Sequence, residues 1–191
     1  MCIRDRYHYA GRPVMPLAAH DADGNVLYVG TMSKTLAPGL RMGMLCAPRA
    51  VVDAVLARRL AVDRQGDTAT ELAIAELVED GTIARHLRRM RRVYAARQTA
   101  LAAGLRETFG DRLRFEVPGG GLALWVRADT DVAAWQARAV ERGLGFDVAR
   151  RYHLDGSPLP WLRAGFASLH EDELEKAVRI LAESWPDGGG T

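Results

Sequence analysis

The chain has 191 residues, of which 48% are hydrophobic and 26% are charged, and its formal net charge is +2. This size allows a real core, in one large or two small domains, and the near balance of charge argues against a protein built mainly to bind nucleic acid. No apolar run is long enough to cross a bilayer, and no secretory signal opens the sequence. Cys2 and Cys46 form neither a disulfide framework nor a metal-binding spacing, so we expect a cytoplasmic protein with Cys46 as a small buried residue.

The first predicted elements are two strands on either side of a polar loop. Residues 25–30 follow the turn at 21–24, and residues 42–47 form a second apolar run, so we expect two neighbouring strands of one sheet. Pro48 suits the first turn of a helix that should run to about residue 61. A second helix is predicted to follow Asp67-Thr68 and to break at Gly81, with these apolar positions: Leu72, Ile74, Leu77 and Val78.

The next predicted helix is long and amphipathic. Its buried stripe consists of apolar residues at helical intervals: Ile83, Leu87, Met90, Tyr94, Leu101 and Leu105. Its arginines lie largely off that stripe: Arg85, Arg88, Arg89, Arg92 and Arg97. Such a run could contact nucleic-acid phosphates, but acidic residues flank it, so a solvated face with intramolecular salt bridges is the favoured interpretation.

The C-terminal part is predicted to alternate strands and helices. We expect strands at 115–117 and 122–126 around the turn at 118–121, then a helix at 132–142 and short strands at 145–148 and near Arg163. Ser168 and Glu171 are predicted to form the capping box of a last helix, whose apolar stripe is Leu174, Val178, Leu181 and Trp185. The domain boundary is expected near residue 84, dividing the sequence into residues 1–84, 85–185 and a disordered tail at 186–191.

The segment with the most specific chemistry runs from Tyr28 to Gly43 and contains Lys34, one of only two lysines in the chain. A lysine amine can form a Schiff base with a carbonyl cofactor, which arginine cannot do. Hydroxyl groups, backbone amides and the forked guanidinium of Arg41 are suited to a phosphate, and Pro38-Gly39 can turn Arg41 back toward Lys34. The alternative is a surface loop with an incidental lysine.

The run Ser-Lys-Thr-Leu-x-Pro-Gly-Leu-Arg-x-Gly, which begins at Ser33, resembles the lysine motif of pyridoxal-phosphate enzymes of the aspartate aminotransferase superfamily. It looks most like the aminotransferase-type domain of MocR/GabR regulators and like aminoadipate-type aminotransferases. The resemblance implies an α/β fold: the C-terminal part of a fold type I large domain followed by an α+β small domain. It also implies that pyridoxal 5′-phosphate forms the internal aldimine with Lys34, while Arg41, with Thr31 or Ser33, holds the phosphate.

Three further segments resemble the same group: residues 79–97, 118–125 and 161–175. In the last of them Arg163 corresponds to the arginine that pairs with the substrate α-carboxylate, a task that suits a bidentate guanidinium. An ordinary edge-strand arginine in contact with water is the alternative. The family also has an Asp-x-Tyr pair before the lysine strand, but the aligned positions here are Met1 and Ile3, which cannot replace it. We therefore expect a C-terminal piece of a longer protein.

Three functions remain open from the sequence. In a MocR/GabR-type regulator this part would sense pyridoxal phosphate or an amino-acid or amine ligand as a homodimer, and DNA would bind only through an N-terminal domain absent here. In a free-standing aminotransferase, Lys34 would also move the proton that transamination requires. In the third reading the chain is a catalytically inert folding or dimerisation unit.

Overall fold

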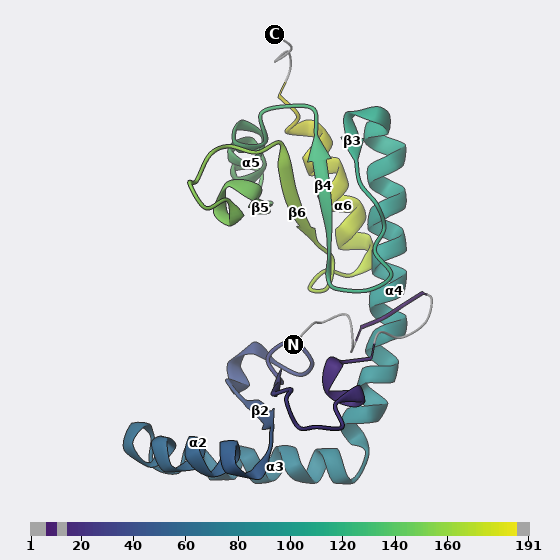
Figure 1. Ribbon diagram of the computed structural model, residues 1–191. Helices are drawn as coiled ribbons and strands as arrows, with labels where there is room; N and C mark the ends of the chain where they lie inside the picture. The colour runs from purple at the N-terminus through teal and green to yellow at the C-terminus, as the bar shows by residue number, and fades with distance from the viewer. Residues whose placement is uncertain (1–6, 11–14, 187–191) are drawn as a thin grey trace. The chain divides into compact units, whose positions relative to one another are not determined.

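The computed structural model describes residues 7–10 and 15–186, and it divides into two compact units, residues 1–91 and 92–191 (Figure 1). The division falls within one long helix, between Arg91 and Arg92, whereas the sequence placed the domain boundary near residue 84. Both units mix helices with antiparallel strands. Apart from Pro186, the predicted disordered tail lies outside the described residues.

The first unit contains a two-stranded antiparallel sheet of β1 (Tyr28–Thr31) and β2 (Gly43–Cys46). The two predicted strands are therefore confirmed as neighbours, but β1 begins later than expected. The carboxylate of Asp21 accepts the backbone N–H groups of Asn25 (3.1 Å) and Val26 (2.7 Å), so these residues complete a turn instead of extending the strand. Cys46 is exposed, and its predicted place in the core is wrong, because it ends a strand of a sheet with only two strands.

Two helices follow the sheet, α2 (Arg49–Val62) and α3 (Thr68–Glu79), and they confirm both predicted helices. Asp67 caps α3, because its carboxylate accepts the N–H of Thr70 at 3.1 Å and the Thr70 hydroxyl at 2.5 Å. These bonds lower the pKa of Asp67. Only part of the predicted apolar face of α3 is correct: Ile74 is buried, whereas Leu72 and Val78 are exposed.

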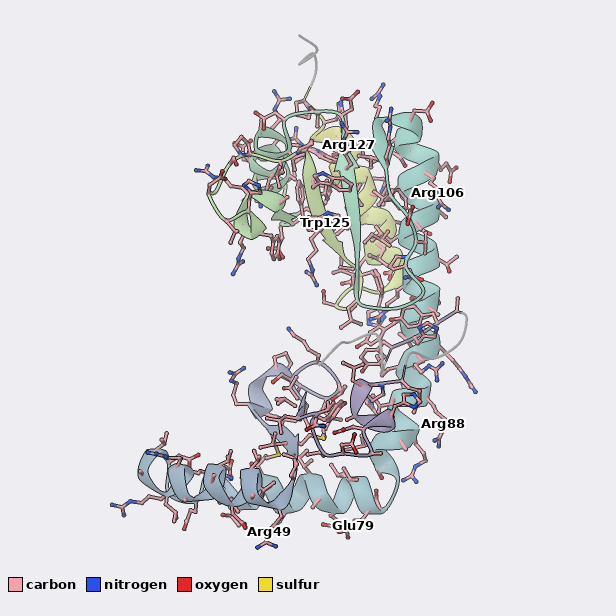
Figure 2. All side chains as sticks on the ribbon, viewed as in Figure 1. Arg49, Glu79, Arg88, Arg106, Trp125 and Arg127 are labelled. Carbon is pink, nitrogen blue, oxygen red and sulfur yellow. The ribbon has the colours of Figure 1, made fainter. Side chains whose placement is uncertain are left out.

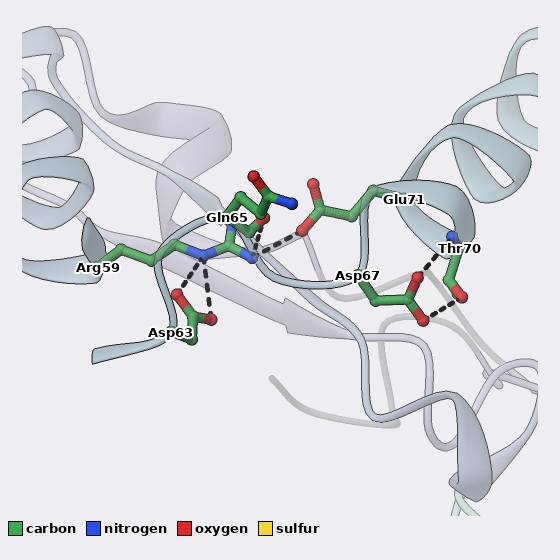
Figure 3. A network of polar contacts seen from close by, with 6 residues as sticks. All are labelled: Arg59, Asp63, Gln65, Asp67, Thr70 and Glu71. Carbon is green, nitrogen blue, oxygen red and sulfur yellow. Dashed lines mark hydrogen bonds and ion pairs between the residues drawn. The ribbon is translucent and has the colours of Figure 1, made fainter. Parts of the chain in front are cut away.

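A polar network joins the end of α2 to the start of α3 (Figure 3). The Arg59 guanidinium donates from Nη2 to Glu71 Oε1 at 2.8 Å and from Nε to both carboxylate oxygens of Asp63. The bond to Glu71, and then that to Asp63, raise the pKa of Arg59. Between them Gly66 has a φ of +69°, which favours glycine, and a Cβ there would displace the end of the Arg59 side chain.

The long helix α4 (Thr82–Phe109) confirms the predicted amphipathic helix, with one error. Arg97, expected off the buried stripe, is only 7% exposed. Its Nη1 donates to the carbonyl of Ala167 at 2.6 Å, and its Nη2 lies 3.1 Å from Nδ1 of His170. A long charged side chain can be buried when its terminal donors find partners, as both Nη atoms of Arg97 do, although its buried Nε has none among the described residues. Periodicity alone does not reveal such partners.

The second unit is built on a four-stranded antiparallel sheet in the order β3-β4-β6-β5. Its strands and helices are β3 (Leu113–Arg114), β4 (Ala123–Ala128), α5 (Val132–Glu141), β5 (Asp147–Val148), β6 (Trp161–Gly165) and α6 (Glu171–Glu183). Along β4 and β6, buried and outward-facing side chains alternate, as expected for a sheet with one covered face. The helix α6 lies across that face in Figure 1. Trp135 of α5 is fully buried and donates from Nε1 to the carbonyl of Leu181 in α6 at 2.9 Å.

Two local predictions in this unit are wrong. The strand expected at 115–117 is absent; the pairing with β4 involves only residues 113–114, and residues 115–118 have no regular structure. The last helix is capped by His170 and not by Ser168, with the N–H of His170 donating to Glu173 at 2.7 Å. The reason is that Phe166 still bonds the carbonyl of Leu122 (3.2 Å), which keeps the chain on the sheet beyond β6.

Candidate functional site

Lys34 lies on a tight turn that leaves the end of β1. The carbonyl of Met32 accepts three hydrogen bonds across this turn: from the backbone N–H of Thr35 (3.1 Å), the N–H of Leu36 (2.8 Å) and the Thr35 hydroxyl (3.3 Å). Met32 and Thr35 are buried, while Lys34 between them is exposed. The turn therefore buries Met32 and Thr35 and directs Lys34, the only lysine of the motif, toward solvent.

The loop that contains Lys34 closes on itself. Thr31 pairs with Gly43 across the sheet, and the N–H of Met32 donates to the carbonyl of Met42 at 2.9 Å. A Cβ at Gly43 would lie 2.9 Å from the carbonyl oxygen of Gly30, so the close approach of the strands requires glycine there. Since residues 32 and 42 face each other at the neck of the loop, Ser33 and Arg41 begin and end the loop side by side.

A short 3-10 helix, η2 (Pro38–Leu40), reverses the chain within this loop. It ends at Arg41, which has the left-handed backbone conformation with a φ of +48°. The turn predicted at Pro38-Gly39 is therefore confirmed. Arg41 is exposed, and within the part of the chain that the structure describes neither Arg41 nor Lys34 has an ion-pair partner.

The two hydroxyl groups considered for a phosphate site have different roles. The Thr31 hydroxyl donates to the carbonyl of Met42 at 3.2 Å and accepts the N–H of Ser33 at 3.1 Å, so it holds the loop together. The Ser33 side chain, by contrast, is half-buried at the loop entrance, next to the end that bears Arg41. An amine, a hydroxyl and a guanidinium on one loop fit the donor set that a phosphorylated aldehyde requires.

Arg163 is half-exposed on the outward face of the sheet in the second unit. Its neighbours across the sheet are Trp125 on β4 and Asp147 on β5. The guanidinium Nη1 lies 3.5 Å from Asp147 Oδ2, and the same carboxylate accepts the hydroxyl of Tyr152 at 3.3 Å and lies 3.6 Å from the Arg151 guanidinium. Arg163 also borders a cavity of about 570 Å³. This arginine is thus accessible and oriented, as a carboxylate-binding group must be.

The sequence reasoning missed the aromatic residues around Arg163. Trp125 is 41% exposed, and its ring lies 5.7 Å from Tyr152 and 6.2 Å from Trp161 between centroids. Figure 2 labels Trp125 and Arg127, both on the outward face of β4. The period of two along 123–128 was the available signal, since it puts large residues at the solvent-facing positions.

The predicted site residues thus fall into two groups. Thr31, Ser33, Lys34 and Arg41 share one loop of the first unit, and Arg163 belongs to the second unit. The substitutions expected at Met1 and Ile3 for the family's Asp-x-Tyr pair lie outside the described residues.

Comparisons with known proteins agree on one family for this chain. The model of the aminotransferase class I and II family matches residues 7–181. The aromatic-amino-acid aminotransferase 1 of Thermococcus litoralis is 27% identical over 92% of this chain and 43% of its own length. The "Probable rhizopine catabolism regulatory protein MocR" of Rhizobium meliloti is 30% identical over 94% of this chain and 37% of its own. The chain thus spans less than half the length of these curated relatives.

Solved structures agree with this result. The multiple substrate aminotransferase of Thermococcus profundus has a TM-score of 0.84 and 26% identity, covering 94% of this chain and 45% of that chain. The kynurenine aminotransferase of Pyrococcus horikoshii, solved with PMP, has a TM-score of 0.83 and 24% identity over the same shares of the two chains. The fold is therefore that of a partial aminotransferase.

Proposed function

Because this chain belongs to the aminotransferase class I and II family, whose cofactor is pyridoxal phosphate, we propose that Lys34 binds this cofactor within a MocR-type transcriptional regulator. In that protein the chain is the aminotransferase-like, ligand-sensing part. The observation that supports this most directly is the exposed Lys34 on a closed loop that also bears Ser33 and Arg41. The similarity to MocR over 94% of the chain supports the regulator as the parent protein.

Each polar side chain has one task in this proposal, in the loop of the first unit or on the sheet of the second. Pyridoxal phosphate supplies an aldehyde for covalent attachment and a ring that stabilises negative charge on a substrate carbon. The Lys34 amine is the attachment point, and Arg41 and Ser33 hold the phosphate. Thr31 acts indirectly, because its hydroxyl already fixes the loop. Arg163 holds the carboxylate of an amino-acid ligand, and Asp147 limits the orientations of its guanidinium.

The cofactor site can be tested on the purified chain by a visible absorbance titration with pyridoxal phosphate. Condensation of the amine with the aldehyde releases one water, and borohydride then fixes the product as a secondary amine that peptide mapping locates. We expect the adduct on Lys34 and its loss in Lys34→Ala, while Lys176→Ala, which changes the only other lysine, retains it. An adduct confined to Lys176 or the amino terminus would contradict the proposal.

A free-standing aminotransferase is the second candidate, and the similarity to the Thermococcus litoralis enzyme favours it. In that case the Lys34 amine would also be the acid/base group that moves the proton of the substrate α-carbon. Multiple turnovers between an amino acid and a 2-oxo acid would select the enzyme. A spectral change on adding an amino acid, without turnover, would select the sensor.

We also propose that the protein is a cytoplasmic homodimer. The helix α2 contains no buried residue, and its exposed apolar side chains include Val55, Leu56 and Leu60. Covering such a face by a second copy would remove apolar surface from water.

No helix in the described ranges is long and apolar enough to span a membrane. Light scattering after gel filtration measures the mass directly, and a monomer at micromolar concentration would contradict the dimer.

A further inference from the structure

The carbonyl oxygen of Thr35, the residue directly after Lys34, is a meeting point of three distant segments. The hydroxyl of Tyr7 donates to it at 3.2 Å, and Nε2 of His86 lies 3.1 Å from it. These partners are 28 residues earlier and 51 residues later in the chain. All three belong to the first unit, so the contact is internal to one compact body.

The chemistry of this contact fixes the role of each partner. A carbonyl oxygen only accepts hydrogen bonds, and its two lone pairs can serve two donors. The Tyr7 hydroxyl therefore donates, and His86 must present Nε2 with its hydrogen. The Thr35 hydroxyl is itself engaged with Met32, so both the backbone and the side chain of Thr35 are held.

Burial makes these bonds structurally demanding. Tyr7 is fully buried and Thr35 is 6% exposed, so water is poorly placed to replace a lost donor. Tyr7 reaches the turn from the N-terminal segment, and His86 reaches it from the first turns of α4. Lys34 is thus an exposed residue on a turn whose inner side is tied to two separate elements.

We propose that His86 and Tyr7 are positioning residues that hold the Lys34 turn in the orientation that presents its amine to an aldehyde ligand. This inference rests on the proposed function of Lys34. Neither residue touches the ligand; each acts through the carbonyl of Thr35. A bound group must meet its reactive partner in a narrow range of geometries, so a turn that tilts loses reactivity even when the protein stays folded.

The first test measures pyridoxal phosphate affinity in variants that differ only in the donor. His86→Leu removes the donor, whereas His86→Gln keeps an amide N–H, and Tyr7→Phe deletes a single oxygen atom. Since one hydrogen bond to a buried carbonyl is lost, we expect about tenfold weaker adduct formation at Lys34 in His86→Leu and Tyr7→Phe. His86→Gln should recover most of this loss. His153→Leu, in the other unit, is the matched histidine control and should behave as wild type.

The second test needs no cofactor and separates this inference from the proposed function. Limited acylation of the ligand-free chain, read by mass spectrometry, gives the ratio of modification at Lys34 to that at Lys176, the only other lysine. We expect His86→Leu and Tyr7→Phe to change this ratio at least twofold, with Lys176 as the internal reference.

The outcomes are distinct. A wild type without a Lys34 adduct defeats the proposed function, but the acylation ratio still tests the positioning role. An unchanged ratio together with unchanged affinity in His86→Leu and Tyr7→Phe overturns the inference. If His86→Leu does not fold, as judged by circular dichroism, Tyr7→Phe decides by the same two measurements.

Discussion

The loop around Lys34 and the sheet around Arg163 are backed by apolar cores of very different size. Of the 23 buried apolar side chains in the described part of the chain, 19 belong to the second unit and four to the first, namely Tyr7, Met32, Ile74 and Ile83. Arg163 is therefore on a strand backed by a substantial apolar core, in register with two neighbouring strands. Lys34 is on a turn that hydrogen bonds to backbone carbonyls hold, together with a small apolar cluster built on Met32, Ile74 and Ile83.

This difference affects how each site should respond to change. Apolar burial is non-directional, so the sheet can lose a contact and keep its register. Hydrogen bonds are directional, so a turn with a small core depends on each donor for its orientation, even where the acceptor keeps a second partner. We therefore expect the second unit to contribute most of the stability. In the first unit we expect single substitutions to change the orientation of the Lys34 turn.

The strongest test of the core of the second unit is Trp135→Ala. This side chain is fully buried against Phe109, Phe146 and Trp185, and it also donates to Leu181. We expect a loss of about 3–5 kcal/mol in the free energy of unfolding, measured by urea denaturation with circular dichroism. Trp125→Ala is the matched control on the exposed face, and equal losses in the two variants would remove the distinction between core and face.

A smaller loss is expected when the buried polar contact of the same unit is broken. Arg97→Met keeps most of the apolar stem but removes the donors to Ala167 and His170. We expect a loss of about 1–3 kcal/mol in the free energy of unfolding, because the part-buried carbonyl of Ala167 loses this donor. Arg92→Met, at an exposed position of the same helix, should stay within about 0.5 kcal/mol of wild type.

In the first unit, Gly66→Ala tests the connection between α2 and α3. The positive φ at this position disfavours an L side chain, and the new Cβ would displace the Arg59 guanidinium from Glu71. We expect a loss of about 1–2 kcal/mol, seen as faster hydrogen exchange in α2 and α3. Gly39→Ala is the control, because its φ is not positive and its Cβ would meet nothing within 4 Å. Similar exchange in the two variants would show that the connection is not strained.

The smallest effect concerns the charge on the cap of α3. Hydrogen bonds from Thr70 lower the pKa of Asp67 in the folded state, so its carboxylate stabilises the fold above the unfolded pKa, near 3.8. That contribution is lost as the pH falls through the lowered folded value. Asp67→Asn keeps a capping side chain but removes the charge. Its melting temperature should be below that of wild type at pH 7, and the difference should shrink below about pH 4. A difference independent of pH would exclude this electrostatic origin.

The sequence predicted the helices more accurately than the strands. The start signal at Pro48 located α2, and local residue patterns located α3, α4, α5 and α6 to within a few residues, since each helix satisfies its own backbone hydrogen bonds. The expected strand at 115–117 was wrong because its pairing depends on β4, which is distant in sequence. The capping residue of α6 was wrong for a similar reason, since the pairing of Phe166 with Leu122 delays the start of the helix.

In the candidate site, too, local features were easier to predict than contacts between distant residues. The motif at 33–43 predicted the turn at Pro38-Gly39, which is confirmed because the Pro-Gly pair acts locally. Its assignment of Lys34 and Arg41 to a cofactor site stays a prediction. The ion pair of Arg163 with Asp147 could not be predicted in this way, because Asp147 belongs to another strand. The bond from the Thr31 hydroxyl to the carbonyl of Met42 depends on how the loop closes, 11 residues later.

The sequence by itself determined the helices, which follow from local residue types and spacing, and its motif at 33–43 resembled the family that the comparisons then showed. Only the tertiary structure decided that Arg97 is buried, that Cys46 is exposed, and that Tyr7 and His86 meet at the carbonyl next to Lys34. The physical reason is that burial and hydrogen bonding depend on residues that are distant in the chain. The two partners of Arg97, for example, lie 70 and 73 positions away.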